Sequence, residues 1–129
     1  MSVFSRIVLL VSGLGFIGFG TWVLVDPIGA FQNMNLAMPD EASIRIELRS
    51  FYGGLEIGLG LFLLGCLGHP SRINTGLWLT AAAFGTIGVV RLAGMLTEGY
   101  ASPTFWAALG TELGLAIAAL IALKFRPER

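Results

Sequence analysis

The chain has 129 residues, the length of a single domain, and its eight basic and eight acidic residues cancel, which leaves no basic field to attract nucleic acid. Hydrophobic residues make up 55% of the chain, charged residues only 12%, and the mean hydropathy is +0.80. Soluble domains carry about a quarter of their residues as Asp, Glu, Lys or Arg, so this composition excludes an ordinary soluble domain and indicates an integral protein of the lipid bilayer.

Four stretches are apolar and long enough to cross a hydrocarbon core, which takes about 20 residues. In chain order they cover approximately residues 7–25, 44–67, 73–96 and 104–123. Because they fill most of the chain, we expect residues 1–129 to form a single integral membrane domain. The predicted fold is all-α, a multi-pass transmembrane four-helix bundle.

The connections between these stretches differ in charge. Basic residues lie before the first span, between the second and third, and after the fourth: Arg6, Arg72, Lys124, Arg126 and Arg129. The other two connections are mainly acidic, with Arg45 at a helix edge: Asp26, Asp40, Glu41 and Glu98. The positive-inside rule therefore predicts that both termini are cytoplasmic.

Glycines are frequent in the predicted spans. Residues 13–18 match the GxGxxG pattern of dinucleotide-binding proteins, but that pattern needs a strand before it, and here it lies inside an unbroken apolar stretch. We therefore interpret the glycines as sites of close helix packing. Gly54-x-x-x-Gly58 has the spacing that lets two backbones approach in lipid, so we expect Gly53, Gly54 and Gly58 to pack helices, within the chain or between chains.

Ionisable residues also fall inside the predicted spans: Arg49, Glu56, Arg91 and Glu112. One charge at a helix centre costs about 2.5–3.5 kcal/mol, so these side chains should face one another or a wet cavity. Arg45, Arg49, Tyr52 and Glu56 share one face of an α-helix by their spacing. We predict a buried polar cluster, which is a structural ion-pair network, a ligand site or a proton or ion path: Arg49, Tyr52, Glu56, Arg91 and Glu112.

Catalytic and metal-binding motifs are not found. The single cysteine, Cys66, and the single histidine, His69, exclude a disulfide within the chain, a CxxC motif and a bis-histidine site. We therefore expect no metal and no cofactor. The sequence also contains no nucleophile–base pair and no phosphate loop, so we expect no enzyme activity. A weaker alternative makes Glu56 or Glu112 the acid or base for a membrane-borne substrate.

The segment from Glu47 to Gly60, with its Arg49-x-x-Tyr52-Gly53-Gly54 core, and the later Arg91-Leu92-x-Gly94 resemble a known family. This family comprises small bacterial four-helix inner-membrane proteins catalogued as a domain of unknown function, with a more distant similarity to DoxX-like proteins. The resemblance covers nearly the whole chain and implies an all-helical inner-membrane protein with no established reaction. DoxX-like proteins include subunits associated with quinone-linked oxidoreductases, so the resemblance also implies an accessory or quinone-proximal role.

Two functions follow as hypotheses. The first is a non-catalytic accessory subunit or scaffold of a membrane-protein complex or homo-oligomer, favoured by the small size and the glycine-rich faces. The second is a membrane-embedded binder of a small amphiphilic ligand, such as a quinone or a lipid-like molecule, at the polar cluster. The sequence favours the first.

Overall fold

A computed structural model describes residues 2–125, and these form helices and connections without a strand. The elements are α1 (Ser2–Val25), α2 (Pro27–Asn33), α3 (Ala42–Glu47), η1 (Leu48–Leu55), α4 (Glu56–Cys66), η2 (Pro70–Arg72), α5 (Ile73–Glu98) and α6 (Pro103–Lys124). The predicted all-α class is confirmed. Two of the basic residues used above, Arg126 and Arg129, lie outside the described residues.

Three helical stretches of the described chain are long and apolar enough to cross a membrane: Val3–Val25, Pro70–Glu98 and Pro103–Lys124. The prediction was four. The exception is the predicted span at 44–67, where α3, η1 and α4 follow one another directly but η1 is a π-helix of eight residues. This segment is also less apolar, because it contains Arg49, Ser50 and two glycines. A membrane crossing by this stretch therefore stays a prediction.

Local capping explains where several of the helices begin and end. Asp26 accepts a hydrogen bond from the Gly29 N–H at the start of α2, and the Ser102 hydroxyl accepts one from the Phe105 N–H at the start of α6. Side-chain oxygens at this position satisfy backbone donors that have no partner inside the helix. At the other end of α5, Gly99 adopts a left-handed conformation with φ of 63°, which glycine tolerates best and which ends the helix.

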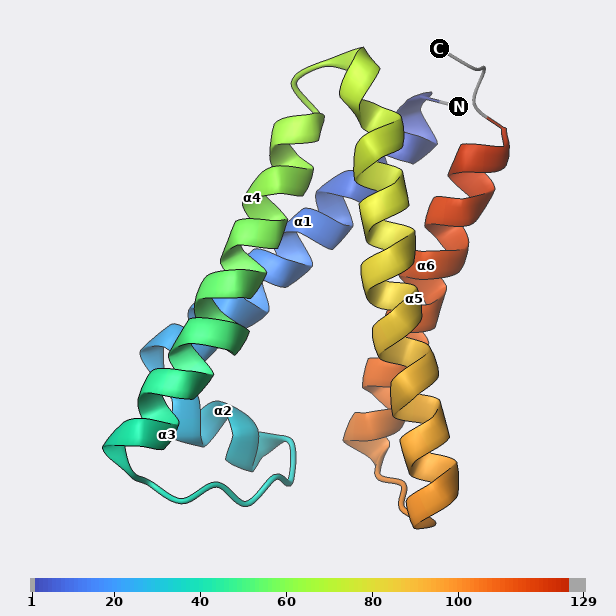
Figure 1. Cartoon of the computed structure of the whole chain (residues 1–129). Coiled ribbons are helices and arrows are strands. Elements are labelled where there is room, and N and C mark those ends of the chain that lie inside the picture. Colours follow the sequence, from blue (N-terminus) through green and yellow to red (C-terminus); the bar gives the residue numbers. More distant parts are fainter. Residues whose placement is uncertain (1, 126–129) are drawn as a thin grey trace.

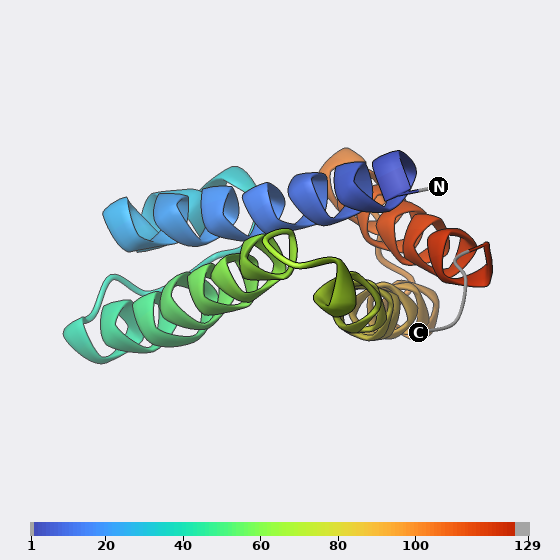
Figure 2. The same ribbon diagram turned by 90° about the horizontal axis from the view of Figure 1, so that it is seen from above.

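The helices form two antiparallel pairs (Figure 1). In one pair α1 packs on η1 and α4, and in the other α5 packs on α6. The pairs lie together at the end that carries η2, which we call the turn end. They diverge toward the opposite end, which carries the 34–41 connection and which we call the loop end (Figures 1 and 2). The molecule is thus open on the loop side.

Two separate apolar cores account for this divergence. The turn-end core draws on all four long helical stretches: Val8, Leu9, Phe16, Leu63, Cys66, Ile73, Leu77, Phe84, Ala116, Ala119 and Ala122. The loop-end core is smaller and comes from α1, α2 and η1 alone: Val23, Ala30, Phe31 and Leu48. Because α5 and α6 contribute no buried residue to the loop-end core, no buried apolar contact joins the two helix pairs at that end.

Glycines hold α1 against η1 and α4. A Cβ on Gly60 would lie 2.6 Å from the carbonyl oxygen of Gly13, and one on Gly20 would lie 2.8 Å from that of Gly53. Both segments, 13–20 and 53–60, read Gly-x-x-x-Ile-Gly-x-Gly. Since the helices are antiparallel, the first glycine of each segment meets the last glycine of the other. The two segments therefore form a locally two-fold contact.

Only one of the three glycines predicted to pack helices does so within this chain. Gly53 is buried against Leu24, whose Cδ2 would lie 2.7 Å from an added Cβ. Gly54 and Gly58 are exposed, and a Cβ on Gly58 would have no atom within 4 Å. The Gly54-x-x-x-Gly58 spacing therefore marks a face that is open to the surroundings rather than the contact with α1.

Candidate functional site

Arg91 of α5 and Glu112 of α6 form an ion pair with two parallel hydrogen bonds. Nε of Arg91 donates to Oε1 of Glu112 and Nη2 donates to Oε2, each at 2.8 Å. The side chains are 28% and 12% exposed, respectively. The ring of Phe105 lies against the guanidinium, with its centroid 5.3 Å from Cζ. The structure thus brings two of the predicted site residues together in a fixed geometry.

Small residues on α5 make this pairing possible. A Cβ on Gly88 would lie 2.6 Å from the Leu113 side chain, and one on Gly85 would lie 3.6 Å from Ala116. The backbones of α5 and α6 therefore approach closely about one turn from Arg91. This close approach sets the distance that the Arg91 and Glu112 side chains have to bridge.

Tyr52 and Glu56 belong to the opposite helix pair and face the same region. Glu56 is partly buried and its carboxyl group lies near that of Glu112, and the Tyr52 hydroxyl group lies near the Arg91 guanidinium. The Tyr52 ring packs edge-to-face on Phe31, with centroids 4.9 Å apart. These interactions reach from one pair to the other in the part of the molecule where the pairs diverge.

Arg49 lies apart from these residues. Its side chain is exposed, and its Nε donates to the carbonyl oxygen of Leu24 at 3.0 Å, near the end of α1. Carbonyls in the last turn of a helix have no partner inside the helix, so Arg49 caps α1. No charged residue in the described chain is buried. The predicted buried cluster of five residues is therefore not formed. The structure shows instead a partly buried ion pair between Arg91 and Glu112, with Tyr52 and Glu56 facing it, and Arg49 lies at the end of α1.

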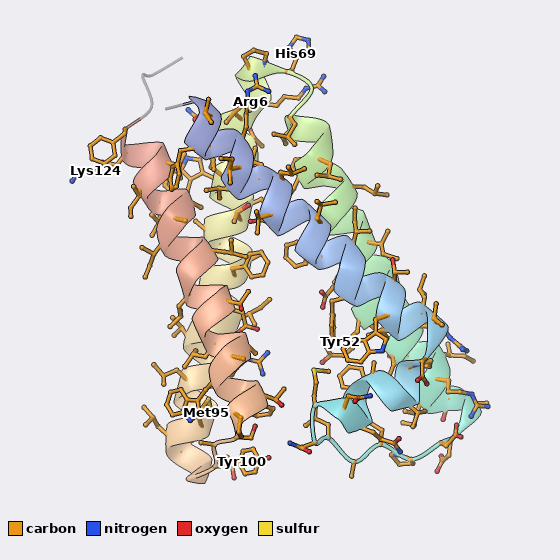
Figure 3. All side chains as sticks on the ribbon, turned by 180° about the vertical axis from the view of Figure 1, so that it is seen from behind. Arg6, Tyr52, His69, Met95, Tyr100 and Lys124 are labelled. Carbon is orange, nitrogen blue, oxygen red and sulfur yellow. The ribbon has the colours of Figure 1, made fainter. Side chains whose placement is uncertain are left out.

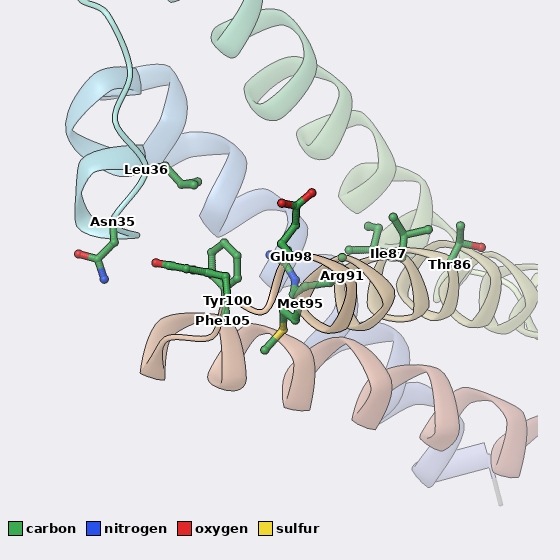
Figure 4. A pocket seen from close by; sticks show the side chains of 11 residues that line it. Asn35, Leu36, Thr86, Ile87, Arg91, Met95, Glu98, Tyr100 and Phe105 are labelled. Atoms are coloured by element: carbon green, nitrogen blue, oxygen red, sulfur yellow. The ribbon is translucent and has the colours of Figure 1, made fainter.

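A cavity of about 950 Å³ lies between α5 and the 34–41 connection. Figure 4 shows Asn35 and Leu36 on one side and Arg91 and Glu98 along α5 on the other. The wall is largely apolar and is formed by Asn35, Leu36, Thr86, Ile87, Val90, Arg91, Gly94, Met95, Glu98, Tyr100 and Phe105. Sites for small molecules commonly enclose about 300–1,000 Å³ and combine an apolar wall with few polar groups.

None of the cavity residues other than Arg91 was predicted as a site residue. Glu98 and Tyr100 were assigned to a connection, although the spacing of Arg91 and Glu98, seven residues, places them on one face of α5. Asn35 and Leu36 offered no comparable signal. Asn35 has a φ of 62°, a left-handed conformation that few residues other than glycine adopt. Within the described residues, no group of His, Cys, Asp or Glu side chains is arranged to hold a metal ion.

Comparison with known proteins identifies the family. The family described as Domain of unknown function (DUF4345) matches residues 4–123, nearly the whole chain. No curated protein and no solved structure matches the chain. The resemblance to a family of unknown function, inferred above from the Arg49–Gly54 and Arg91–Gly94 motifs, is confirmed. The chain is a member of the DUF4345 family.

Proposed function

We propose that this protein binds a small amphiphilic ligand, quinone-like or lipid-like, in the cavity between its two helix pairs. The observation that carries the proposal is an apolar cavity of about 950 Å³ with a pre-positioned arginine in its wall. Ile87, Val90 and Leu36 would contact the apolar part of the ligand. The polar part would lie toward Arg91 and Glu98.

The ion pair supports this role because it leaves hydrogen-bonding capacity unused. A guanidinium has five N–H donors, and two of those of Arg91 point at Glu112. The other three are available to an acceptor in the cavity. Glu112 and Phe105 hold the guanidinium in place before a ligand arrives, so binding would lose little side-chain entropy.

We propose further that the chain crosses the inner membrane four times, with both termini in the cytoplasm. Arg6 and Lys124 lie at the turn end with His69, whereas Tyr100 lies at the loop end (Figure 3). The acidic connections also lie at the loop end, so the charge distribution follows the positive-inside rule. The helical stretch from Ala42 to Cys66 is longer than the roughly 20 residues that a crossing takes, so it can serve as the remaining crossing.

Cysteine labelling tests this orientation. With Cys66→Ser as the background, Ser43→Cys at the loop end should react with a membrane-impermeant maleimide on intact cells. Ser71→Cys at the turn end should react only after the cells are permeabilised. Both serines are exposed in the structure, so each cysteine would be accessible to the reagent on its own side. Labelling of Ser71→Cys on intact cells would overturn the proposed orientation.

Filling the cavity tests the binding function. Val90→Trp would occupy the cavity, whereas the adjacent Val89 is equally exposed, at 62% against 64%, and does not line the cavity. Native mass spectrometry of protein extracted gently from its own membranes should show a bound small-molecule mass on the wild type and on Val89→Trp. We expect that mass to be absent from Val90→Trp. A wild-type protein without ligand, or equal occupancy in all three, would refute binding in this cavity.

The exposed glycine face favours a second candidate, an accessory subunit or scaffold. Gly54 and Gly58 lie on one helical face, and a Cβ on Gly58 would have no atom within 4 Å. In lipid such a face lets a helix of another protein approach closely. In the same mass spectra, a stoichiometric protein mass in place of a small molecule would support this candidate.

A further inference from the structure

The distribution of charge around the cavity points to the class of its ligand. We propose that the cavity takes an amphiphile with a positively charged head group, a protonated amine or a quaternary ammonium, bound beside Glu98, Tyr100 and Phe105. This inference rests on the proposed function, because it names the ligand class for the same cavity. It adds a head-group site at the end of α5.

The first argument is the balance of charge. Arg91 is the one cationic residue among those that line the cavity in the described chain, and its charge is matched by the two oxygens of Glu112. Glu98 also lines the cavity, and its carboxylate has no ion-pair partner among the described residues. The region therefore carries more negative than positive charge, which attracts a cation and repels an anion.

The second argument is the position of Glu98. It is the last residue of α5, where the helix dipole is negative and an acidic side chain is unfavourable. The Gly99 and Tyr100 N–H groups both return to the carbonyl of Met95, so the last carbonyls of α5 lack those partners. Within the described residues, the Glu98 carboxylate forms no hydrogen bond or ion pair. A ligand cation would stabilise this carboxylate.

The third argument is the presence of two aromatic rings beside Glu98. Tyr100 and Phe105 pack edge-to-face with centroids 5.4 Å apart, and both line the cavity beside Glu98. Figure 4 shows Glu98 and Tyr100 together where α5 ends. Aromatic ring faces attract cations and are the usual partners of quaternary ammonium groups. Phe105 already contacts the Arg91 guanidinium, whereas Tyr100 is 45% exposed and available to a ligand.

Photo-crosslinking with head-group variants of one probe tests the inference. The probes are alkyl chains with a diazirine near the head and a trimethylammonium, hydroxyl or sulfonate group. They are added to protein in uncharged maltoside micelles, and labelled peptides are sequenced. We expect the trimethylammonium probe to label the segment 94–105, which contains the cavity residues beside the head-group site, about tenfold more than the others, the size expected from one charge-assisted contact.

Two charge-neutralising variants complete the experiment. Glu98→Gln should reduce labelling by the cationic probe to the level of the hydroxyl probe. Glu47→Gln, which removes an exposed acid that does not line the cavity, should leave it unchanged. Equal labelling by all three probes, above the level seen in Val90→Trp, would overturn the cation inference and leave the proposed function standing. Labelling by no probe above the Val90→Trp level would overturn both.

Discussion

Replacing Arg91 with leucine should lower the free energy of unfolding by about 3 kcal/mol, the lower end of the range for breaking a buried ion pair. The loss is large because the Glu112 side chain is only 12% exposed and would lose the two hydrogen bonds that now stabilise its carboxylate. Titration of the purified protein from mild detergent into dodecyl sulfate, followed by circular dichroism, measures the change.

Two further variants distinguish the effect of breaking the ion pair on the free energy of unfolding from the effect of removing an arginine. Arg49→Leu removes an arginine that donates to one backbone carbonyl, and we expect it to cost about 1 kcal/mol. The double variant Arg91→Leu with Glu112→Leu removes both charges and should recover most of the stability lost in Arg91→Leu. If Arg91→Leu costs no more than Arg49→Leu, the pair does not stabilise the fold.

Gly60→Ala should destabilise the protein by about 1–3 kcal/mol, the usual cost of an extra carbon in a close-packed interior. Its Cβ would lie 2.6 Å from the Gly13 carbonyl oxygen, closer than two such atoms can approach. That oxygen belongs to the backbone of α1, so relief requires the two helices to separate. The same unfolding titration measures the effect.

Gly58→Ala is the matched control. It makes the same change two residues away on the same helix, where an added Cβ has no atom within 4 Å. Because alanine favours helices over glycine by about 1 kcal/mol, we expect Gly58→Ala to be neutral or stabilising. Equal destabilisation by Gly58→Ala and Gly60→Ala would show that the loss comes from something other than the contact with α1.

Three of the four predicted stretches match the structure closely because their boundaries depend on local chemistry. The predicted 73–96 and 104–123 correspond to Ile73–Glu98 and Pro103–Lys124, since Gly99 ends one helix and Ser102 caps the next. The π-helix in the remaining stretch was not predicted. Apolar composition and spacing contain no signal for a change in the hydrogen-bonding pattern of the backbone.

That π-helix also explains why Arg49 was grouped with the wrong residues. The predicted shared face of Arg49 and Glu56 assumed 3.6 residues per turn, but all the intervening residues belong to η1, where hydrogen bonds span five residues. The larger number of residues per turn changes which side chains share a face. The expectation that Arg91 and Glu112 would face other charged groups followed from the cost of an unpaired charge in lipid, which does not depend on helix type, but it did not specify which residues pair.

The cavity could not be predicted from local patterns, because it results from the divergence of two helix pairs. Its opposite walls come from the 34–41 connection and α5, which lie far apart in the sequence. The absence of α5 and α6 from the loop-end core keeps these walls separate. The formation of this cavity depends on which apolar helix faces pack against each other in the folded chain. The sequence of each helix alone does not specify that packing.

The separation of the two cores has a mechanical consequence. The pairs are joined in the turn half, as far as the stacked rings of Phe16 and Phe84, 4.5 Å apart. From Phe84 to Glu98, α5 extends for about 21 Å, so a rotation of about 10° at this joint moves its end by about 4 Å. A rotation of one helix pair relative to the other at this joint therefore produces its largest displacement at the loop end. Such a displacement would change the width of the cavity, which lies at the loop end between α5 and the 34–41 connection.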